Sequence, residues 1–220
     1  IFRVPVLLRK KLANAGLLSL LSFPFLGKKR VQKLFKNNQY DVINTHFAVP
    51  SGPLGVWASK KFKVPHVLFV HGGDVYDPSK TLSPHKWWFF RWAVKKVLNK
   101  SHKVLCQSSN TKKNIIDFYH YKKPVDIVPL GFEPPLNLPL KEPQKLKLNP
   151  DFFYLISVGR LVRRKNFDLL IQCLKNLPSA IHLILIGSGP EEKKLKDLAL
   201  SLNIEERILF TGRLEKEEEK

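Results

Sequence analysis

FFYLISVGRLVRRKNFDLLIQCLKNLPSAIHLILIGSGPEE, residues 152–192, is the stretch that decides the fold expected for this chain. It contains two apolar runs typical of buried strands, FFYLISV (152–158) and IHLILIG (181–187). Between these runs, apolar residues recur at helical spacing from Phe167 to Leu177. A strand, a helix and a second strand in this order predict a βαβ unit with a parallel sheet.

The same alternation extends to both sides of this stretch. Pro190 suits the first turn of a further helix, and Arg207 to Phe210 reads as one more short strand. Upstream, strand-like and helical patterns alternate in the order DVINTHF (41–47), helix over 51–61, HVLFVH (66–71), helix over 83–99 and KVLCQS (103–108). The chain is therefore predicted to be an α/β protein with parallel sheets.

Prolines divide the chain into two domains. Five of them interrupt the segment from Glu133 to Pro150 and discourage regular structure there. We predict an N-terminal Rossmann-like domain over residues 1–132, a linker over 133–149 and a C-terminal domain over 150–220.

Charge is distributed unevenly between these domains. The net charge is +20, and residues 1–149 hold 26 Lys and Arg against 7 Asp and Glu, whereas residues 150–220 hold 12 against 11. A basic domain suits nucleic acid, an anionic membrane surface or phosphorylated substrates, and charge alone leaves these three open. No apolar run approaches the roughly 18 to 20 residues of a spanning helix, so we expect a soluble or peripheral protein.

The two cysteines indicate neither a disulfide framework nor a metal site. Cys106 and Cys173 both lie in apolar runs and lack the spacing of metal ligands. We expect both to be buried, reduced core residues.

A first candidate binding motif is His71-Gly72-Gly73-Asp74, which follows the apolar run HVLFV. Parallel α/β sheets bind ligands beyond the carboxyl ends of their strands. Glycine lets the backbone approach a ligand, while His and Asp supply hydrogen-bonding groups. Two interpretations stay open: a ligand-binding loop, or a tight turn in which Asp74 caps a helix and His71 is a structural donor.

A second candidate is the loop from Gly159 to Asn166, which follows the strand at 152–158. Arg160 and Lys165 could converge on a diphosphate, Arg as a planar fork and Lys as a point charge. The alternative interpretation is that this segment is only a basic surface loop. Asn166 could then simply cap the next helix.

A third candidate is the turn Gly187-Ser188-Gly189, which lacks the full spacing of a phosphate-binding GxGxxG loop. Glu191 and Glu192 behind it would repel an anion, so the turn suits a nucleoside contact or simple turn geometry. The role of His46, which follows DVINT, also stays open. It could face the cleft, or it could belong to the core or to a turn.

One predicted helix combines aromatic and basic residues, WWFF at 87–90 and Trp92 beside Lys86, Arg91, Lys95 and Lys96. This mixture suits a membrane interface or an acidic partner. The competing interpretation is that aromatic residues on every side of a helix belong to the core. Residues 1–36 form a second basic, amphipathic zone.

Taken in order, seven segments resemble the family-4 glycosyltransferases of GT-B fold. They are DVINTHF, VHGGD, KVLCQSSN, IVPLGFE, SVGRLVRRKNFDLLI, LILIGSGPEEKKLKDLA and RILFTGRL, and they cover about residues 41 to 214. The resemblance implies two Rossmann-like domains that face a cleft, the N-terminal one for the acceptor and the C-terminal one for a nucleotide-diphosphate sugar. It also implies sugar transfer with retention and without a metal or other cofactor.

The resemblance also implies roles for particular residues. Arg160 and Lys165 would contact the donor diphosphate, and His71 would approach the donor sugar as a third catalytic residue. Substrate-binding roles would fall to Gly72, Gly73, Asp74, Gly159, Gly187 and Gly189, with Asp74 on the acceptor side. The family often has glycine after the lysine, where Asn166 stands.

Other family features are missing from the sequence. The acidic motif of two glutamates expected after Leu214 is absent, and so are a first strand and glycine-rich loop before residue 1. Together with the absence of Met, this predicts a fragment truncated at both ends: an inactive piece of a hexosyl-type glycosyltransferase.

The predicted parent enzyme would act in cell-surface glycan or glycolipid synthesis, in the cytoplasm or as a peripheral protein on the inner membrane face. Its partners would be the donor, a glycan or lipid-linked acceptor and an anionic membrane surface. The alternatives are a noncatalytic membrane-associated scaffold of glycosyltransferase origin, or a basic nucleic-acid-binding protein.

Overall fold

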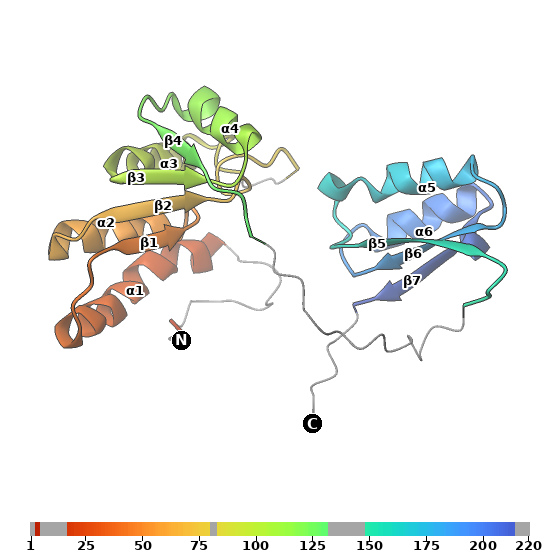
Figure 1. Ribbon diagram of the computed structural model, residues 1–220, viewed down its shortest axis with the longest axis horizontal. Coiled ribbons are helices and arrows are strands. Elements are labelled where there is room, and N and C mark those ends of the chain that lie inside the picture. Colours follow the sequence, from red (N-terminus) through yellow and green to blue (C-terminus); the bar gives the residue numbers. More distant parts are fainter. Residues whose placement is uncertain (1–2, 5–16, 80–82, 132–147, 214–220) are drawn as a thin grey trace. The chain divides into compact units, whose positions relative to one another are not determined.

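The computed structural model describes residues 3–4, 17–79, 83–131 and 148–213 of the chain (Figure 1). The chain divides into two compact units, Ile1–Glu133 (unit 1) and Pro134–Lys220 (unit 2). Each unit has its own parallel sheet and its own core. Most of the predicted linker, 133–149, lies outside the described residues, so the linker stays a prediction.

Unit 1 contains four parallel strands in the order β1-β2-β3-β4 (Figure 1). Its elements are α1 (Leu17–Asn37), β1 (Ile43–His46), α2 (Ser51–Phe62), β2 (His66–Val70), α3 (Trp88–Lys100), β3 (Lys103–Cys106), α4 (Ser109–Tyr119) and β4 (Val125–Ile127). Each crossover between neighbouring strands carries one helix, and α2, α3 and α4 contact one another in sequence. Right-handed crossovers that step in one direction place such helices on one face of the sheet.

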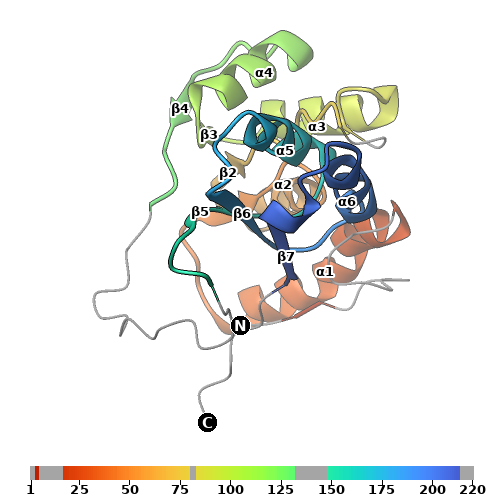
Figure 2. The ribbon, with the colours of Figure 1, turned by 90° about the vertical axis from the view of Figure 1, so that its right-hand side faces the viewer.

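Unit 2 contains three parallel strands in the order β5-β6-β7. Its elements are β5 (Phe153–Val158), η1 (Arg163–Lys165), α5 (Phe167–Lys175), β6 (Ile181–Ile186), α6 (Glu192–Ser201), η2 (Glu205–Arg207) and β7 (Ile208–Gly212). Helices α5 and α6 lie next to each other and bury Phe167, Ile171 and Leu195 with the sheet (Figure 2). In both units, the predicted parallel α/β arrangement is confirmed.

Helix α3 differs from one interpretation of its sequence. Only Val94, Val97 and Leu98 of this helix are buried, whereas Trp88 is 81% and Trp92 56% exposed. The interpretation of the aromatic residues as core is therefore wrong for Trp87, Trp88, Phe89 and Trp92. The aliphatic residues of the C-terminal half belong to the core of unit 1, and these four aromatic residues stay exposed.

Other departures are smaller. Cys106 is buried as predicted, but Cys173 is exposed, because it lies between Ile171 and Leu174 on the outer side of α5. Helix α6 begins at Glu192, two residues after the proline predicted to open it. No helix in the ranges that the structure describes is long and apolar enough to cross a membrane.

A buried histidine ties α3 to the sheet of unit 1. The His66 side chain is fully buried, with Nε2 2.7 Å from Thr45 Oγ1 and Nδ1 3.2 Å from Ser101 Oγ. The Ser101 hydroxyl donates to the carbonyl of Val97, so it accepts from His66 Nδ1–H, and Nε2 accepts from Thr45. Burial, followed by the electrostatic effect of nearby His102, lowers the pKa of His66 from 6.5 to about 4.

This histidine predicts a loss of stability in mild acid. Below about pH 6.5 the unfolded chain binds a proton at His66 and the folded chain does not, so the free energy of unfolding falls by up to about 3 kcal/mol as the pH approaches 4. Denaturant titrations followed by tryptophan fluorescence measure this for unit 1, which contains all four tryptophans.

A His66→Gln variant should lose this part of the pH dependence. His120→Asn is the matched control, because His120 is exposed and has a left-handed backbone that Asn tolerates. An unchanged pH dependence in His66→Gln would show that another group is responsible.

Candidate functional site

Three side chains of unit 1 lie at the carboxyl ends of adjacent parallel strands. His46 ends β1, His71 follows β2 and Gln107 follows β3. In parallel sheets these ends meet at one edge, where α/β proteins bind ligands. The register pairs His46 with Phe69, which places His46 two residues from the level of His71.

The two histidines at this edge are hydrogen-bonded to each other. His46 Nδ1 lies 2.8 Å from His71 Nε2, so one of these nitrogens carries the shared proton and the other accepts it. The rings of Phe47 and Phe69 lie 4.5 Å and 4.9 Å from the His71 ring. His71 is thus held on several sides, and of the two roles left open for His46, the one at the ligand-binding edge fits its position.

Phe47 itself has a strained backbone. Its φ of 72° falls in the left-handed region, which is uncommon for a bulky residue. Its amide donates to the carbonyl of Phe69 and its carbonyl accepts from Gly52. Such strain persists where surrounding bonds enforce it, and it is found most often at functional edges of this kind.

Asp74 organises the loop after β2. Its carboxylate oxygens accept from the backbone N–H groups of Ala48, at 2.6 Å, and His71, at 3.0 Å. Burial raises the pKa of the Asp74 carboxyl, while these hydrogen bonds act in the opposite direction. Turns rather than a helix follow Asp74, so the interpretation of this residue as a helix cap is wrong.

Gln107 is a positioning residue that the sequence analysis did not identify. Its side-chain amide donates to the carbonyl of His71 over 2.8 Å. The sequence does contain a signal for Gln107, because this residue directly follows the strand KVLC. His71 likewise directly follows its own strand, β2. The carboxyl ends of β1, β2 and β3 therefore jointly fix one histidine.

In unit 2, the loops after β5 and β6 are joined through their backbones. Gly159 donates to the carbonyl of Ile186, and Leu161 donates to the carbonyl of Ser188. A Cβ on Gly187 would lie 2.0 Å from the Gly159 oxygen, and one on Gly189 would lie 2.2 Å from the Leu161 oxygen. Gly187 also has a φ of 138°, which favours glycine. Both glycines are thus required by the contact between the two loops.

The two predicted diphosphate ligands, Arg160 and Lys165, stand on the loop between β5 and α5. Both are exposed, and Lys165 ends the short helix η1. Asn166 follows with a φ of 50°, and its side chain makes no capping hydrogen bond. Asn166 therefore stands at the cap position of α5, as that interpretation expects, but without a side-chain capping bond, and its left-handed backbone explains why glycine and Asn suit this position.

Arg163, in the same loop, has a different environment. It lines a cavity of about 310 Å³ between α5 and α6, together with Asp168 and Glu191. Its surroundings therefore include carboxylates.

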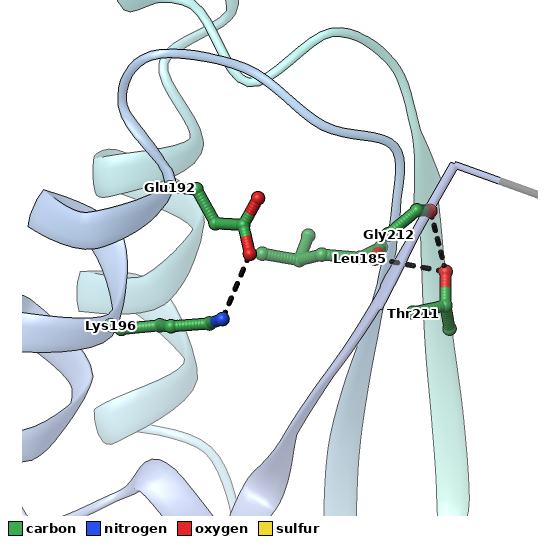
Figure 3. Close-up of polar contacts among 5 residues, drawn as sticks. All are labelled: Leu185, Glu192, Lys196, Thr211 and Gly212. Atoms are coloured by element: carbon green, nitrogen blue, oxygen red, sulfur yellow. Dashed lines mark hydrogen bonds and ion pairs between the residues drawn. The ribbon is translucent and has the colours of Figure 1, made fainter.

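The two glutamates at the start of α6 are paired with lysines on the same helix. Glu192 accepts from Lys196 over 2.8 Å (Figure 3), and Glu191 lies 3.6 Å from Lys194. At the end of β7, the Thr211 hydroxyl lies 3.4 Å from the carbonyl of Leu185 and 3.0 Å from that of Gly212 (Figure 3). Neighbouring lysines offset part of the repulsion that these glutamates would exert on an anion.

The predicted site residues thus form two groups. His71, Gly72, Gly73 and Asp74 lie in unit 1, and Gly159, Arg160, Lys165, Gly187 and Gly189 lie in unit 2. The backbone contacts of unit 2 bring its three glycines together. Within the described ranges, no three His, Cys, Asp or Glu side chains gather as a metal site would require.

Comparison with known proteins agrees with this fold. Sucrose-phosphate synthase of Thermosynechococcus elongatus matches with a TM-score of 0.65 at 20% identity, over 92% of this chain and 54% of that one. The Anabaena protein HepE, solved in complex with UDP-glucose, matches with a TM-score of 0.61 at 21% identity, over 86% and 52%. The fold is that of the GT-B glycosyltransferases.

Sequence comparison then gives the family. The model for Glycosyltransferase Family 4 matches residues 3–135, and that for Glycosyl transferases group 1 matches residues 140–220. The chain belongs to the family-4 glycosyltransferases, as its resemblance predicted.

Its curated relatives are distant. They include alpha-monoglucosyldiacylglycerol synthase of Streptococcus pneumoniae, 24% identical over 86% of this chain and 46% of the relative. Another is UDP-Gal:alpha-D-GlcNAc-diphosphoundecaprenol alpha-1,3-galactosyltransferase of Escherichia coli, 25% identical over 96% and 55%. The chain spans about half the length of the curated relatives that it matches.

The contact between the two loops of unit 2 predicts the effect of a single methyl group. Gly187→Ala should lower the free energy of unfolding of unit 2 by about 1–3 kcal/mol, because its Cβ collides with Gly159 and its backbone becomes strained. Hydrogen exchange of peptides from β5 and β6, read by mass spectrometry, reports this directly.

Gly159→Ala is the matched control for this substitution. Its Cβ would meet the nearest atom, Phe167 Cζ, at an ordinary 3.4 Å. Equal exchange rates in Gly187→Ala and the unmodified chain would contradict the proposed need for glycine.

Proposed function

We propose that the whole protein transfers a hexosyl group from a nucleotide-diphosphate sugar to an acceptor hydroxyl, with retention of anomeric configuration. The observation that carries this proposal is the hydrogen-bonded pair of loops after β5 and β6, which displays Arg160 and Lys165 beyond the carboxyl end of a parallel strand. Membership of family 4 and the UDP-glucose in the HepE structure support a nucleotide-sugar donor.

The two cations of unit 2 would act on the leaving group. As the bond from the anomeric carbon to the diphosphate oxygen breaks, negative charge grows on that oxygen, and Arg160 and Lys165 would stabilise it. The acceptor hydroxyl would attack from the same face and pass its proton to the departing phosphate. The resemblance implies no metal for this step, and we propose the same here.

His71 would position the donor sugar. His46 is hydrogen-bonded to Nε2 of His71, and Gln107 donates to the backbone carbonyl of His71. The other ring nitrogen of His71, Nδ1, would therefore be the one that contacts a sugar hydroxyl. Asp74 would contribute by holding the loop that carries His71. Its contact with the acceptor stays a prediction.

For the acceptor we propose a glycan or lipid-linked molecule of cell-surface glycan synthesis, met at the cytoplasmic face of the membrane. The name of one relative contains monoglucosyldiacylglycerol, and the name of another contains diphosphoundecaprenol. The excess of Lys and Arg in residues 1–149 suits an anionic membrane surface. The predicted inactivity of the 220-residue chain by itself stays a prediction.

The diphosphate role predicts large effects of two substitutions. In the whole protein, Arg160→Ala and Lys165→Ala should each lower kcat/KM by about 10²- to 10³-fold, because charge stabilisation is lost where charge develops. Turnover is measured with a panel of nucleotide-diphosphate sugars, beginning with UDP-sugars.

Arg163→Ala removes the same charge from the same loop and should leave kcat/KM within a few-fold of the unmodified value. Unchanged turnover in both Arg160→Ala and Lys165→Ala would refute the assignment. No binding to any donor would favour the noncatalytic scaffold.

The membrane proposal predicts salt-sensitive binding to vesicles. The chain should sediment with anionic vesicles at low ionic strength and be released as salt shortens the range of electrostatic attraction. Zwitterionic vesicles are the control. Absent or salt-insensitive binding would count against an electrostatic membrane contact, and equal retention on DNA at physiological salt would favour the nucleic-acid alternative.

A further inference from the structure

Helices α1, α2 and α3 of unit 1 line a partly open cavity of about 400 Å³. Its walls include Leu21 and Phe25 of α1, Val56 and Trp57 of α2, and Phe90 and Trp92 of α3. Sites for small ligands are typically cavities of about 300–1,000 Å³ with mostly apolar walls. The cavity belongs to unit 1 alone and includes none of the residues assigned to the donor.

The walls keep large apolar side chains in contact with water. Phe25 is 68% and Trp92 56% exposed. An apolar ligand in the cavity would remove this surface from water, which is favourable in proportion to the area covered. A contiguous exposed apolar region of this kind marks a site of interaction.

Lysines surround the apolar walls. Lys60 and Lys96 line the cavity, and Lys96 Nζ lies 4.5 Å from the centre of the Trp92 ring. Lys28 Nζ lies 5.5 Å from the Trp57 ring and Lys61 Nζ 5.3 Å from it. The ammonium groups thus stand over the same aromatic rings that form the cavity.

The charge on these helices has one sign. None of α1, α2 and α3 contains an Asp or Glu, although all three carry Lys or Arg. A ligand that matches both the cavity and its rim combines an apolar chain with an anionic group.

We propose that this cavity binds one acyl or prenyl chain of an anionic membrane lipid, with the head group held by Lys60, Lys96 and their neighbours. The inference goes beyond the proposed function, since electrostatic attachment to a membrane requires no cavity and sugar transfer requires no lipid at this place. A protein partner would need a strongly acidic, apolar segment, and the hollow between three helices suits a flexible chain better.

The first experiment uses the 220-residue chain and alkyl phosphates of 8 to 14 carbons, below the concentrations at which they form micelles. Calorimetry should show saturable binding of one molecule per chain. The affinity should rise by about fourfold for each added methylene group and then level off when the cavity is full. The assay contains no nucleotide sugar, so its outcome is separate from that of the donor proposal.

Two pairs of variants locate the site. Trp92→Ala should weaken binding at least tenfold, whereas Trp88→Ala, one turn away and outside the cavity, should leave the affinity unchanged. Lys96→Gln should weaken binding of dodecyl phosphate but not of a neutral twelve-carbon alcohol. Lys95→Gln removes the same charge from the adjacent, exposed position and should affect neither.

Vesicles test the membrane as the source of the chain. In a chain with Trp87 and Trp88 replaced by Phe, the remaining Trp57 and Trp92 both line the cavity. Anionic lipids with brominated chains should quench their fluorescence, because bromine quenches only at contact.

Several outcomes would overturn the proposal. The first is the absence of saturable binding at every chain length. The second is an equal loss in Trp88→Ala and Trp92→Ala, which would indicate a diffuse surface. Others are binding of alkyl phosphates without quenching by vesicles, or a dimer in sedimentation equilibrium that Trp92→Ala dissociates.

Discussion

Direct backbone contact between the loops after β5 and β6 is the constraint on which the candidate site of unit 2 depends. Gly187 and Gly189 lack the Cβ atoms that would collide with the carbonyls of Gly159 and Leu161. The hydrogen bonds between the loops then fix where the chain leaves β5, and this departure sets the position of Arg160. Backbone packing between the loops thus fixes the residues on either side of Arg160.

Much of the fold was predictable because its signals are local. Apolar runs that end in glycine and helical spacing after Asn166 specify a βαβ unit without reference to distant residues. The burial of the aromatic residues of α3 was harder to predict, since a helix that mixes aromatic and basic residues fits either a core or a surface. Packing against the sheet decides between them, and only Val94, Val97 and Leu98 were buried there. Cys173 was misjudged for the same reason, because an apolar run does not reveal which side of α5 faces outward.

The candidate site was predictable in its residue types and less so in its contacts. The position of His71, Arg160 and Lys165 after strands follows from the sequence, but the bond between His71 and His46 depends on the pairing of β1 with β2. Gln107 reaches His71 only because β3 lies on the other side of β2. Such contacts between strands depend on register, which a single sequence does not state.

If the joined loops of unit 2 bind the donor as proposed, they also limit how donor preference can change during evolution. A side chain at position 187 or 189 would collide with the backbone of the neighbouring loop, and the backbone of Ser188 is held by Leu161. The Ser188 side chain, by contrast, is exposed between two fixed neighbours. Within this turn, variation among homologues should therefore concentrate at residue 188, where a new side chain changes the chemistry offered to a nucleotide and leaves the backbone in place.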